Sequence, residues 1–473
     1  MQQHTLEGFR LSHQQRRLWQ LQQQSSAYRV QCALIIEGPL KSTTLQEALQ
    51  NVVSRHEILR TAFRFLPSMG LPVQVMAEDW TIALQELDVR QCPEEEQKKR
   101  LNEYLCEGRE RAFDYERGRV IDAGLVAFAA DRHVLVINAS AMCVDEDSLG
   151  KLVGELVGQY EACVAGNSEI RETVQYADFS EWQYELLESD EAAAGREFWE
   201  RERLLTPPPS RLPGESGGGD DSCAYRPEAV TVVVDAGVAR RLEALAAGET
   251  STTATALLAC WQSLLWRLTA EPEVLVQAGF DCGKYDDLRE SLGLFTKYLP
   301  LRCQFGENTS FRDVIRSVDA ASRNAREWQE YYTPRLPQDM RAGVEESALY
   351  HVGFECQPGE HEYRGAGLTF TTTNIRACTE YFKLRLNAAR LMDTLRLSFY
   401  YDPRRFDAEA VVRFSEQYLT LLGASVESPD APVGALALLG ERERDRLLVE
   451  WQGATAPFPH DRCLHQLVEE QAA

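Results

Sequence analysis

Strand-like and helix-like segments alternate along this chain in two successive series, on either side of a segment rich in proline and glycine. In the first series, the apolar run over 133–138 predicts a strand, and residues 147–162 carry apolar side chains at the spacing of one helical face. After the segment 207–222, a strand over 229–235 and a helix over 252–268 restart the alternation. Strands separated by helices favour layered α/β structure. We therefore expect an α/β protein with two lobes of similar size.

The other elements follow from the same periodicities. Strands are predicted over 28–36, 273–280, 349–355 and 395–401, and helices from residue 42 and over 309–330 and 407–423. A polar, partly helical bridge is expected over 165–206, and the segment 207–222 is expected to be a poorly ordered surface loop. With 473 residues, of which 44% are hydrophobic, the chain is long enough to bury two cores.

The chain is strongly acidic. It carries 50 Lys+Arg against 73 Asp+Glu, a formal net charge of −23, which argues against nucleic acid or an anionic membrane as a partner. No apolar stretch reaches the length that spans a membrane, and the first residues, MQQHTLEGFR, lack the apolar centre of a signal peptide. We expect a soluble, cytoplasmic protein.

The cysteines raise the question of a metal site or a disulfide framework. Twelve cysteines are scattered along the chain with no CxxC pair. Most lie in apolar runs, as Cys260 does in ALLACWQSLLW, where a thiol serves as a small hydrophobic group. The spacing therefore predicts neither a zinc site nor a disulfide framework, and we expect no bound metal.

Five short motifs, in the correct order, resemble those of the condensation domains of nonribosomal peptide synthetases. They are LSHQQRRLW over 11–19, RHEILRTAF over 55–63, YADFSEWQ over 176–183, LGLFTKYLPLR over 292–302 and LRLSFYYDPRRF over 395–406. The resemblance assigns structural roles to Arg17 and Arg60 in the first two motifs. The last stretch, QGATAPFPHDRCLHQLVEEQA, is similar to the linker and first helix that lead into an adenylation domain.

The resemblance implies a fold and a set of partners. Condensation domains have two lobes like chloramphenicol acetyltransferase, arranged as a V-shaped pseudo-dimer with a central tunnel. Here the lobes would cover 1–178 and 179–439, and 440–473 would be the linker and first helix of a truncated adenylation domain. The implied partners are donor and acceptor carrier proteins, whose phosphopantetheine arms tether the substrates, and a downstream adenylation domain. The domain itself would bind no cofactor. In the family, an aminoacyl amine attacks an acyl or peptidyl thioester.

The third motif of the family, His-His-x-x-x-Asp-Gly, has a changed counterpart in this chain. Aligned on Asp145 and the helix that follows, the segment 140–146 reads SAMCVDE. Ala141 stands where the family has its proton-handling histidine, and an alanine has no acid–base chemistry. The catalytic candidates are therefore the polar residues of the segment and its continuation, which are Ser140, Asp145, Glu146 and Ser148.

The acids of this segment allow two interpretations. Glu146 or Asp147 could accept a proton beside the tunnel if its pKa were suitable. Alternatively, both acids simply begin a helix, where negative charge suits the dipole, with Asp147 or Ser148 as the cap. Cys143 is flanked by apolar residues, which favours a core position over a nucleophile.

Further changes lie in motifs that face the substrate in the family. Lys297 stands where the fifth motif has asparagine, and EWQEYYTPRL over 327–336 replaces the pattern of the sixth. The resemblance places Met142, Cys143, Lys297 and Tyr298 along the substrate tunnel, where Met142 and Tyr298 are candidates to plug it. The family counterpart of Asp145 pairs with an arginine, and Lys284 is the matching cation here.

Four hypotheses follow, of which the first is favoured. The first hypothesis is that the chain is an active condensation-type domain with unusual catalysis or an unusual reaction. The second hypothesis is that it is a catalytically silent fold that docks carrier proteins or recruits a tailoring enzyme in trans. The third hypothesis is that it is a diverged heterocyclisation domain, which is suggested by the partial match of Ser140, Asp145 and Ser148 to the pattern Asp-x-x-x-x-Asp-x-x-Ser. The last hypothesis is a free acyltransferase. The substrates and the product do not follow from the sequence.

Overall fold

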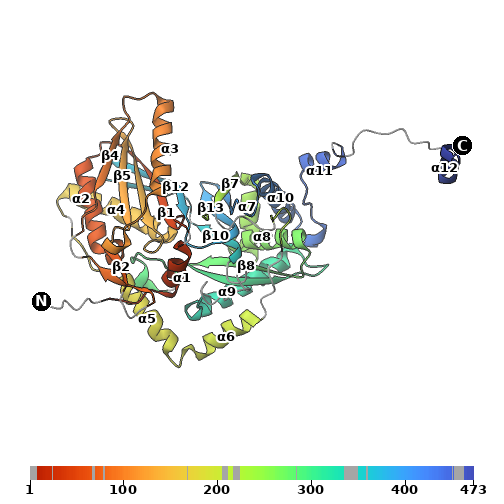
Figure 1. Ribbon diagram of the computed structural model, residues 1–473, viewed down its shortest axis with the longest axis horizontal. Coiled ribbons are helices and arrows are strands. Elements are labelled where there is room, and N and C mark those ends of the chain that lie inside the picture. The colour runs from red at the N-terminus through yellow and green to blue at the C-terminus, as the bar shows by residue number, and fades with distance from the viewer. Residues whose placement is uncertain are drawn as a thin grey trace.

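Two six-stranded mixed sheets, each with helices on its faces, make up most of the molecule (Figure 1). The structure is a computed structural model, and it describes residues 8–23, 25–65, 70–77, 80–167, 169–204, 211–216, 224–283, 285–334, 350–357, 359, 361–449, 451 and 463–472. The expected α/β class is confirmed. Most of the predicted loop 207–222 lies outside the described residues.

The strands are β1 (Arg29–Glu37), β2 (Thr61–Phe65), β3 (Pro72–Met76), β4 (Leu84–Asp88), β5 (Ile121–Ala127), β6 (Arg132–Ser140), β7 (Glu228–Val233), β8 (Glu273–Phe280), β9 (Lys297–Gln304), β10 (Tyr350–Gln357), β11 (Glu362–Gly365), β12 (Leu368–Ala377), β13 (Phe382–Leu391) and β14 (Thr394–Tyr401). The first sheet has the order β11-β12-β1-β6-β5-β4, the second has the order β7-β14-β13-β10-β8-β9, and β2 pairs with β3.

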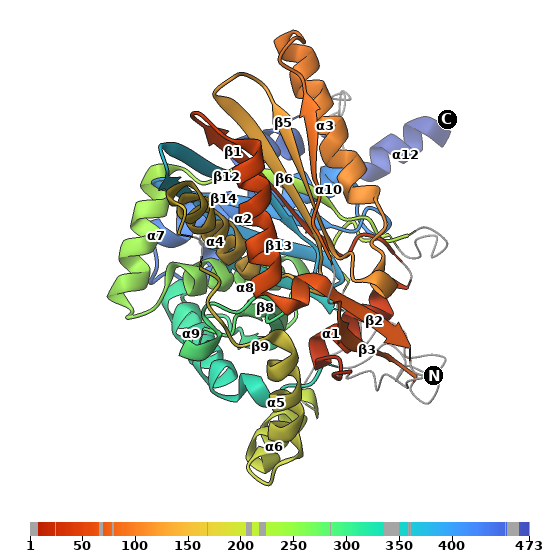
Figure 2. The same cartoon turned by 90° about the vertical axis from the view of Figure 1, so that its left-hand side faces the viewer.

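The helices are α1 (His13–Gln22), α2 (Ser42–Arg55), α3 (Glu94–Glu110), α4 (Glu146–Ala165), α5 (Tyr176–Glu188), α6 (Ala192–Leu204), α7 (Ala236–Gly248), α8 (Thr253–Thr269), α9 (Phe311–Trp328), α10 (Ala408–Glu427), α11 (Glu441–Leu448) and α12 (Leu464–Ala472). Figure 2 shows α2 and α4 side by side over the first sheet, and α4 contacts β1, β11 and β12. Among the described residues, no helix is long and apolar enough to cross a bilayer.

Local sequence explains how several of these elements form. At α1, Ser12 and Gln15 make a capping box, in which each side chain accepts a hydrogen bond from the backbone N–H of the other. The predicted apolar stripe of α4 is buried, and α8 is buried on all sides from Thr255 to Leu265 because it lies in the core of the second half. The strands and helices that the pattern predicted are all present, with ends that differ by a few residues.

The two sheets do not follow the order of the chain. Strands β11 and β12 come late in the sequence, yet β12 pairs antiparallel with β1 and completes the first sheet. The chain then passes directly into β13, at the centre of the second sheet. The lobe boundaries expected from the sequence stay a prediction, but both sheets contain strands from the region after β10.

Candidate functional site

Residues 140–146, the counterpart of the third motif predicted from the sequence, form the turn between β6 and α4. Ser140 ends β6 and is fully buried; its hydroxyl lies 3.0 Å from the Tyr115 hydroxyl and accepts a 3.1 Å hydrogen bond from the Met142 N–H. Tyr115 in turn donates to Gln22 at 3.0 Å. Ala141 has no exposed surface and belongs to the hydrophobic core of the first half. The polar capacity of Ser140 is thus used inside the protein.

Asp145 joins the start of α4 to the fifth motif, 150 residues further along the chain. Its Oδ2 accepts from the N–H groups of Phe295 and Thr296, at 2.9 and 2.8 Å, and from the Thr296 hydroxyl at 2.9 Å. Its Oδ1 accepts from the N–H of Ser148 at 2.9 Å. Asp145 is therefore the helix cap, which corrects the expectation of Asp147 or Ser148. The expected partner Lys284 lies outside the described residues.

Ser148 is also occupied by the same neighbouring segment. It is fully buried, its hydroxyl donates to the Gly293 carbonyl at 2.9 Å, and the Gly293 N–H donates back to it at 3.2 Å. The structure therefore brings Asp145 and Ser148 together, but it places both against the backbone of residues 293–296 rather than beside a cavity.

The four residues expected along the tunnel separate into two groups. Met142 and Cys143 have no exposed surface and lie in the core of the first half, and burial raises the pKa of the Cys143 thiol well above its ordinary value. Lys297 and Tyr298 line a small cavity of about 30 Å³, which has room for about one water molecule. Lys297 pairs with Glu330, and both side chains of this ion pair are buried.

Arg17 and Arg60, to which the resemblance assigns structural roles, make a buried and a half-buried contact respectively. Arg17 is 2% exposed and pairs with Glu380, with Nη2 donating to Oε1 at 2.9 Å. Arg60 donates to the Ala77 carbonyl at 2.9 Å and so holds the end of β3.

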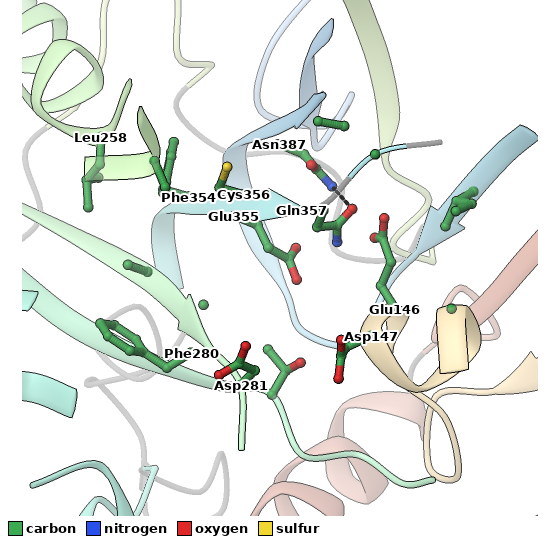
Figure 3. A pocket seen from close by; sticks show the side chains of 18 of the residues that line it. Glu146, Asp147, Leu258, Phe280, Asp281, Phe354, Glu355, Cys356, Gln357 and Asn387 are labelled. Atoms are coloured by element: carbon green, nitrogen blue, oxygen red, sulfur yellow. Dashed lines mark hydrogen bonds between the residues drawn. The ribbon is translucent and has the colours of Figure 1, made fainter. Parts of the chain in front are cut away.

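Glu146 and Asp147 face a cavity of about 940 Å³ between the two halves (Figure 3). Its walls come from the helices α4, α8 and α9 and from the strands β7 to β14. Figure 3 shows the carboxyl groups of Glu146, Asp147, Asp281 and Glu355 around the same space. Asp147 pairs with Lys151 at 2.9 Å. His361 also lines this cavity, and it is exposed.

Glu146 is the carboxyl group of this cavity with the most altered titration. Its Oε2 is buried and has no hydrogen-bond partner among the described residues. Burial, reinforced by the negative charge of Glu355, holds the pKa of Glu146 well above its ordinary value, and Arg385 opposes this shift. The neutral form of Glu146 therefore persists to higher pH than that of an ordinary glutamate.

Two charged residues behind this wall were not anticipated from the sequence. Arg385 is 4% exposed and donates to Glu355 at 3.0 Å, to the Tyr298 hydroxyl at 3.2 Å and to the Ala377 carbonyl at 2.8 Å. Burial raises the pKa of Glu355, although Arg385 acts against the shift. One signal was available: in β13 (FKLRLNAARL), every second residue from Lys383 to Asn387 is polar, which is the alternation of a strand.

A second cavity, of about 250 Å³, adjoins the first. Arg376 of β12 and Tyr400 of β14 line both cavities, so the two hollows meet at these side chains. Among the described residues, no group of three or more His, Cys, Asp or Glu side chains is placed to hold a metal ion.

Comparisons with known proteins agree with this architecture. A model of the condensation-domain family matches residues 6–448. A linear gramicidin synthase of Brevibacillus parabrevis is 27% identical over 98% of this chain and 9% of its own length. Chondramide synthase cmdD of Chondromyces crocatus is 28% identical over 98% of this chain and 12% of its own length. The chain thus spans a small part of these relatives.

Solved structures support the same fold. The X-domain from teicoplanin biosynthesis, in its complex with OxyB, matches with a TM-score of 0.77 and 22% identity, over 92% of this chain and 97% of that one. The first condensation domain of the calcium-dependent antibiotic synthetase, bound to a substrate analogue, matches with a TM-score of 0.79 and 18% identity, over 92% and 99%. Likeness at this level of identity concerns the fold alone.

Proposed function

Because this chain belongs to the condensation-domain family, we propose that it is an atypical condensation-type domain of a nonribosomal peptide synthetase, acting on thioesters tethered to carrier proteins. The amine nitrogen of the acceptor attacks the thioester carbonyl carbon of the donor, the C–N bond forms and the C–S bond breaks. The amine loses a proton, and the departing thiolate takes one up. With Ala141 in place of the imidazole, Glu146 is the group that we assign to this proton transfer.

The observation that carries the proposal is the position of Glu146 on the wall of the 940 Å³ cavity. Cavities of this size accommodate small organic groups. Among the carboxyl groups that line this cavity, Glu146 is the one whose pKa is held well above its ordinary value. The raised pKa makes the ionised form of Glu146 a stronger base than an ordinary glutamate and its neutral form a usable acid. Asp145 and Ser148 serve as its support, since their polar atoms are engaged by residues 293–296.

The loss of the histidine is compatible with turnover on energetic grounds. A well-placed general acid or base contributes about 10²–10⁴-fold to a rate. Holding two tethered reactants in line contributes as much or more, and an amine attacks a thioester readily once it is neutral. The proposed partners are therefore a donor and an acceptor carrier protein with their phosphopantetheine arms, followed by an adenylation domain, in the cytoplasm.

The test loads donor and acceptor carrier proteins with candidate acyl and aminoacyl groups and follows both thioesters by intact mass spectrometry. We expect the peptide-bond mass on the acceptor carrier. Glu146→Gln should lower the rate by about 10²–10³-fold, and the pH profile of the parent, which rises through the raised pKa of Glu146, should flatten. Glu47→Gln, at an exposed position of α2, is the matched control and should keep the parent rate. His361→Asn tests the histidine of the cavity.

Three outcomes would overturn this proposal. Product formation that is unaffected by Glu146→Gln but abolished by His361→Asn would assign the proton transfer to the histidine. No transfer, with carrier proteins still bound, would favour a silent docking fold. The complex of the X-domain with OxyB suggests that such a fold recruits a tailoring enzyme. An additional loss of water would indicate heterocyclisation, which the buried positions of Asp145 and Ser148 support less well.

A further inference from the structure

The second cavity has an unusual charge for this chain. Five arginines and two glutamates are among the described residues that line its 250 Å³, with no lysine, aspartate or histidine, whereas the whole chain has a net charge of −23. The arginines are Arg29, Arg109, Arg226, Arg376 and Arg385. An acidic protein that gathers positive charge around one hollow has a local potential that attracts anions.

The glutamates of the cavity do not balance this charge. Glu380 is committed to Arg17, which lies outside the lining, and both side chains are almost fully buried. Glu110 pairs with Arg226 at 3.3 Å, where both side chains are 69% exposed, so this pair lies at the rim and is largely screened by solvent. The inner arginines therefore lack a matching carboxylate in the lining itself.

Arg29 carries its charge into the interior for a structural reason. It is 6% exposed, and its guanidinium donates to the backbone carbonyls of Ser26, Gly108 and Arg111, at 3.1, 2.6 and 3.0 Å, which fixes the end of α3. Among the described residues it makes no ion pair. A buried cation without a carboxylate is costly, and a bound anion would offset part of that cost.

Arg376 faces the same hollow from the neighbouring strand. The pairing of β1 with β12 sets Gln31 opposite Arg376, and Gln31 lies two residues from Arg29, so these side chains share one face of the first sheet. Arg376 is exposed, lines both cavities, and makes no ion pair in the part of the chain that the structure describes.

The second sheet supplies the opposite wall of the junction. Arg385 projects there from β13, with its guanidinium carbon 4.9 Å from the centre of the Tyr400 ring. Its charge is shared with Glu355, which it contacts from the side of the first cavity. An anion at the junction would therefore meet Arg376 as a free cation and Arg385 as a partly neutralised one.

The geometry points to a binding site for an acyl group that carries its own carboxylate, seated in the second cavity between Arg29, Arg376 and Arg385. The inference rests on the proposed function, since the acyl group arrives as a carrier-bound thioester. A thioester held beside Glu146 in the first cavity directs a short acyl chain across the junction, and a terminal carboxylate then reaches the arginines. The phosphopantetheine arm also carries a phosphate, at the far end of the pantetheine chain from its sulfur. This phosphate is a second anion that could bind the arginines, so the test must distinguish it from the acyl carboxylate.

The test measures binding to the full chain by isothermal titration calorimetry. The probes are stable amide analogues of pantetheine that lack the phosphate and carry either a succinyl group, with a carboxylate, or a succinamyl group, which is neutral and of the same size. We expect the acidic probe to bind at least about tenfold more tightly than the neutral one. Arg376→Gln should remove most of this preference and leave the neutral probe unchanged. Arg132→Gln, at an exposed position where β6 begins, is the matched control and should keep the preference.

Several results would overturn the inference. These are equal binding of the two probes, failure of both to bind, or an equal effect of Arg376→Gln on both. Tight binding of phosphopantetheine without an acyl group, weakened by Arg376→Gln as much as the acidic probe, would assign the charge to the phosphate. The binding test requires no turnover, so the two proposals can fail separately. Preference for the acidic probe without any peptide product would contradict only the proposed reaction. Peptide product without this preference would contradict only the carboxylate site.

Discussion

Asp145 and Glu146 are adjacent in the chain, but their side chains have opposite surroundings. The carboxylate of Asp145 caps the helix, and it accepts hydrogen bonds from backbone N–H groups of α4 and of residues 295–296. Glu146 is the first residue of the helix, so its side chain projects from the axis toward the large cavity, where one oxygen has no partner among the described residues. Backbone position alone therefore separates a structural carboxylate from one that is free to react.

This difference predicts a large loss of stability at Asp145. Asp145→Ala leaves the buried N–H groups of Ser148, Phe295 and Thr296 without an acceptor, and each such group costs about 1–3 kcal/mol. We expect the free energy of unfolding, measured by urea denaturation, to fall by roughly 3 kcal/mol or more. Asp147→Ala, which removes a half-exposed partner of Lys151, should cost less than about 1 kcal/mol. A stable Asp145→Ala protein that has lost only its transfer activity would contradict the structural role.

The capping residue shows where prediction from sequence reaches its limit. The helix over 147–162 followed from its apolar spacing, because that pattern is local. The identity of the cap did not follow, because the choice of Asp145 over Asp147 depends on residues 293–296, which approach only in the folded chain. The polar candidates came from the resemblance to the third motif of the family, whereas only the cavity separates Glu146 from Ser140, Asp145 and Ser148.

At the scale of elements, β9 and the turn after α9 are joined by a buried ion pair between residues far apart in the sequence. Lys297 begins β9, and Glu330 lies in the 3₁₀ turn Gln329–Tyr331. Their side chains are 6% and 5% exposed, and Lys297 also donates to the Gln329 carbonyl at 3.2 Å. Each residue thus compensates the buried charge of the other.

This coupling predicts non-additive effects on stability. Lys297→Asn, which restores the asparagine of the motif, leaves Glu330 buried without its cation, and breaking such a pair costs about 3–5 kcal/mol. The double variant Lys297→Asn with Glu330→Gln removes both charges and should recover most of that loss. Urea denaturation of the two single variants and the double variant gives the coupling energy. Equal losses in the Lys297→Asn single variant and the double variant would mean that the pair has no mutual role.

Strands β12 and β13 mark the other limit of the sequence at this scale. The pattern predicted β1, β6, β8 and β14, whose residues are apolar or alternate in the ordinary way. In β13, polar residues alternate within a strand that is almost wholly buried, because its polar face carries the network of Arg385 and Glu355 between the halves. The alternation of polar residues in β13 was visible in the sequence, but a local pattern does not show that the polar face is buried by a partner sheet. The charged residues behind the cavity were therefore missed.

Across the whole molecule, the two halves are linked through β12 and β13. β12 pairs with β1 in the first sheet, and after four connecting residues the chain enters the middle of the second sheet as β13. Arg385 of β13 donates to the carbonyl of Ala377, the last residue of β12, at 2.8 Å. The core of the first half also includes Phe295 and Tyr381, which come from the later part of the chain. Both halves therefore depend on the same short connection.

This connection predicts that the two sheets unfold together. Thr371→Pro, in the middle of β12, removes a backbone N–H from a strand paired on both sides and should lower the free energy of unfolding by about 3 kcal/mol. Because β12 leads into β13, the protection of backbone amides against hydrogen exchange should fall by a similar factor in β5 and β6 and in β13 and β14. Calorimetry should still record one transition, with matching calorimetric and van't Hoff enthalpies. A loss of protection confined to the first sheet, or two resolved transitions, would show that the halves are energetically separate, and the walls of the cavity would then be free to move apart without unfolding either core.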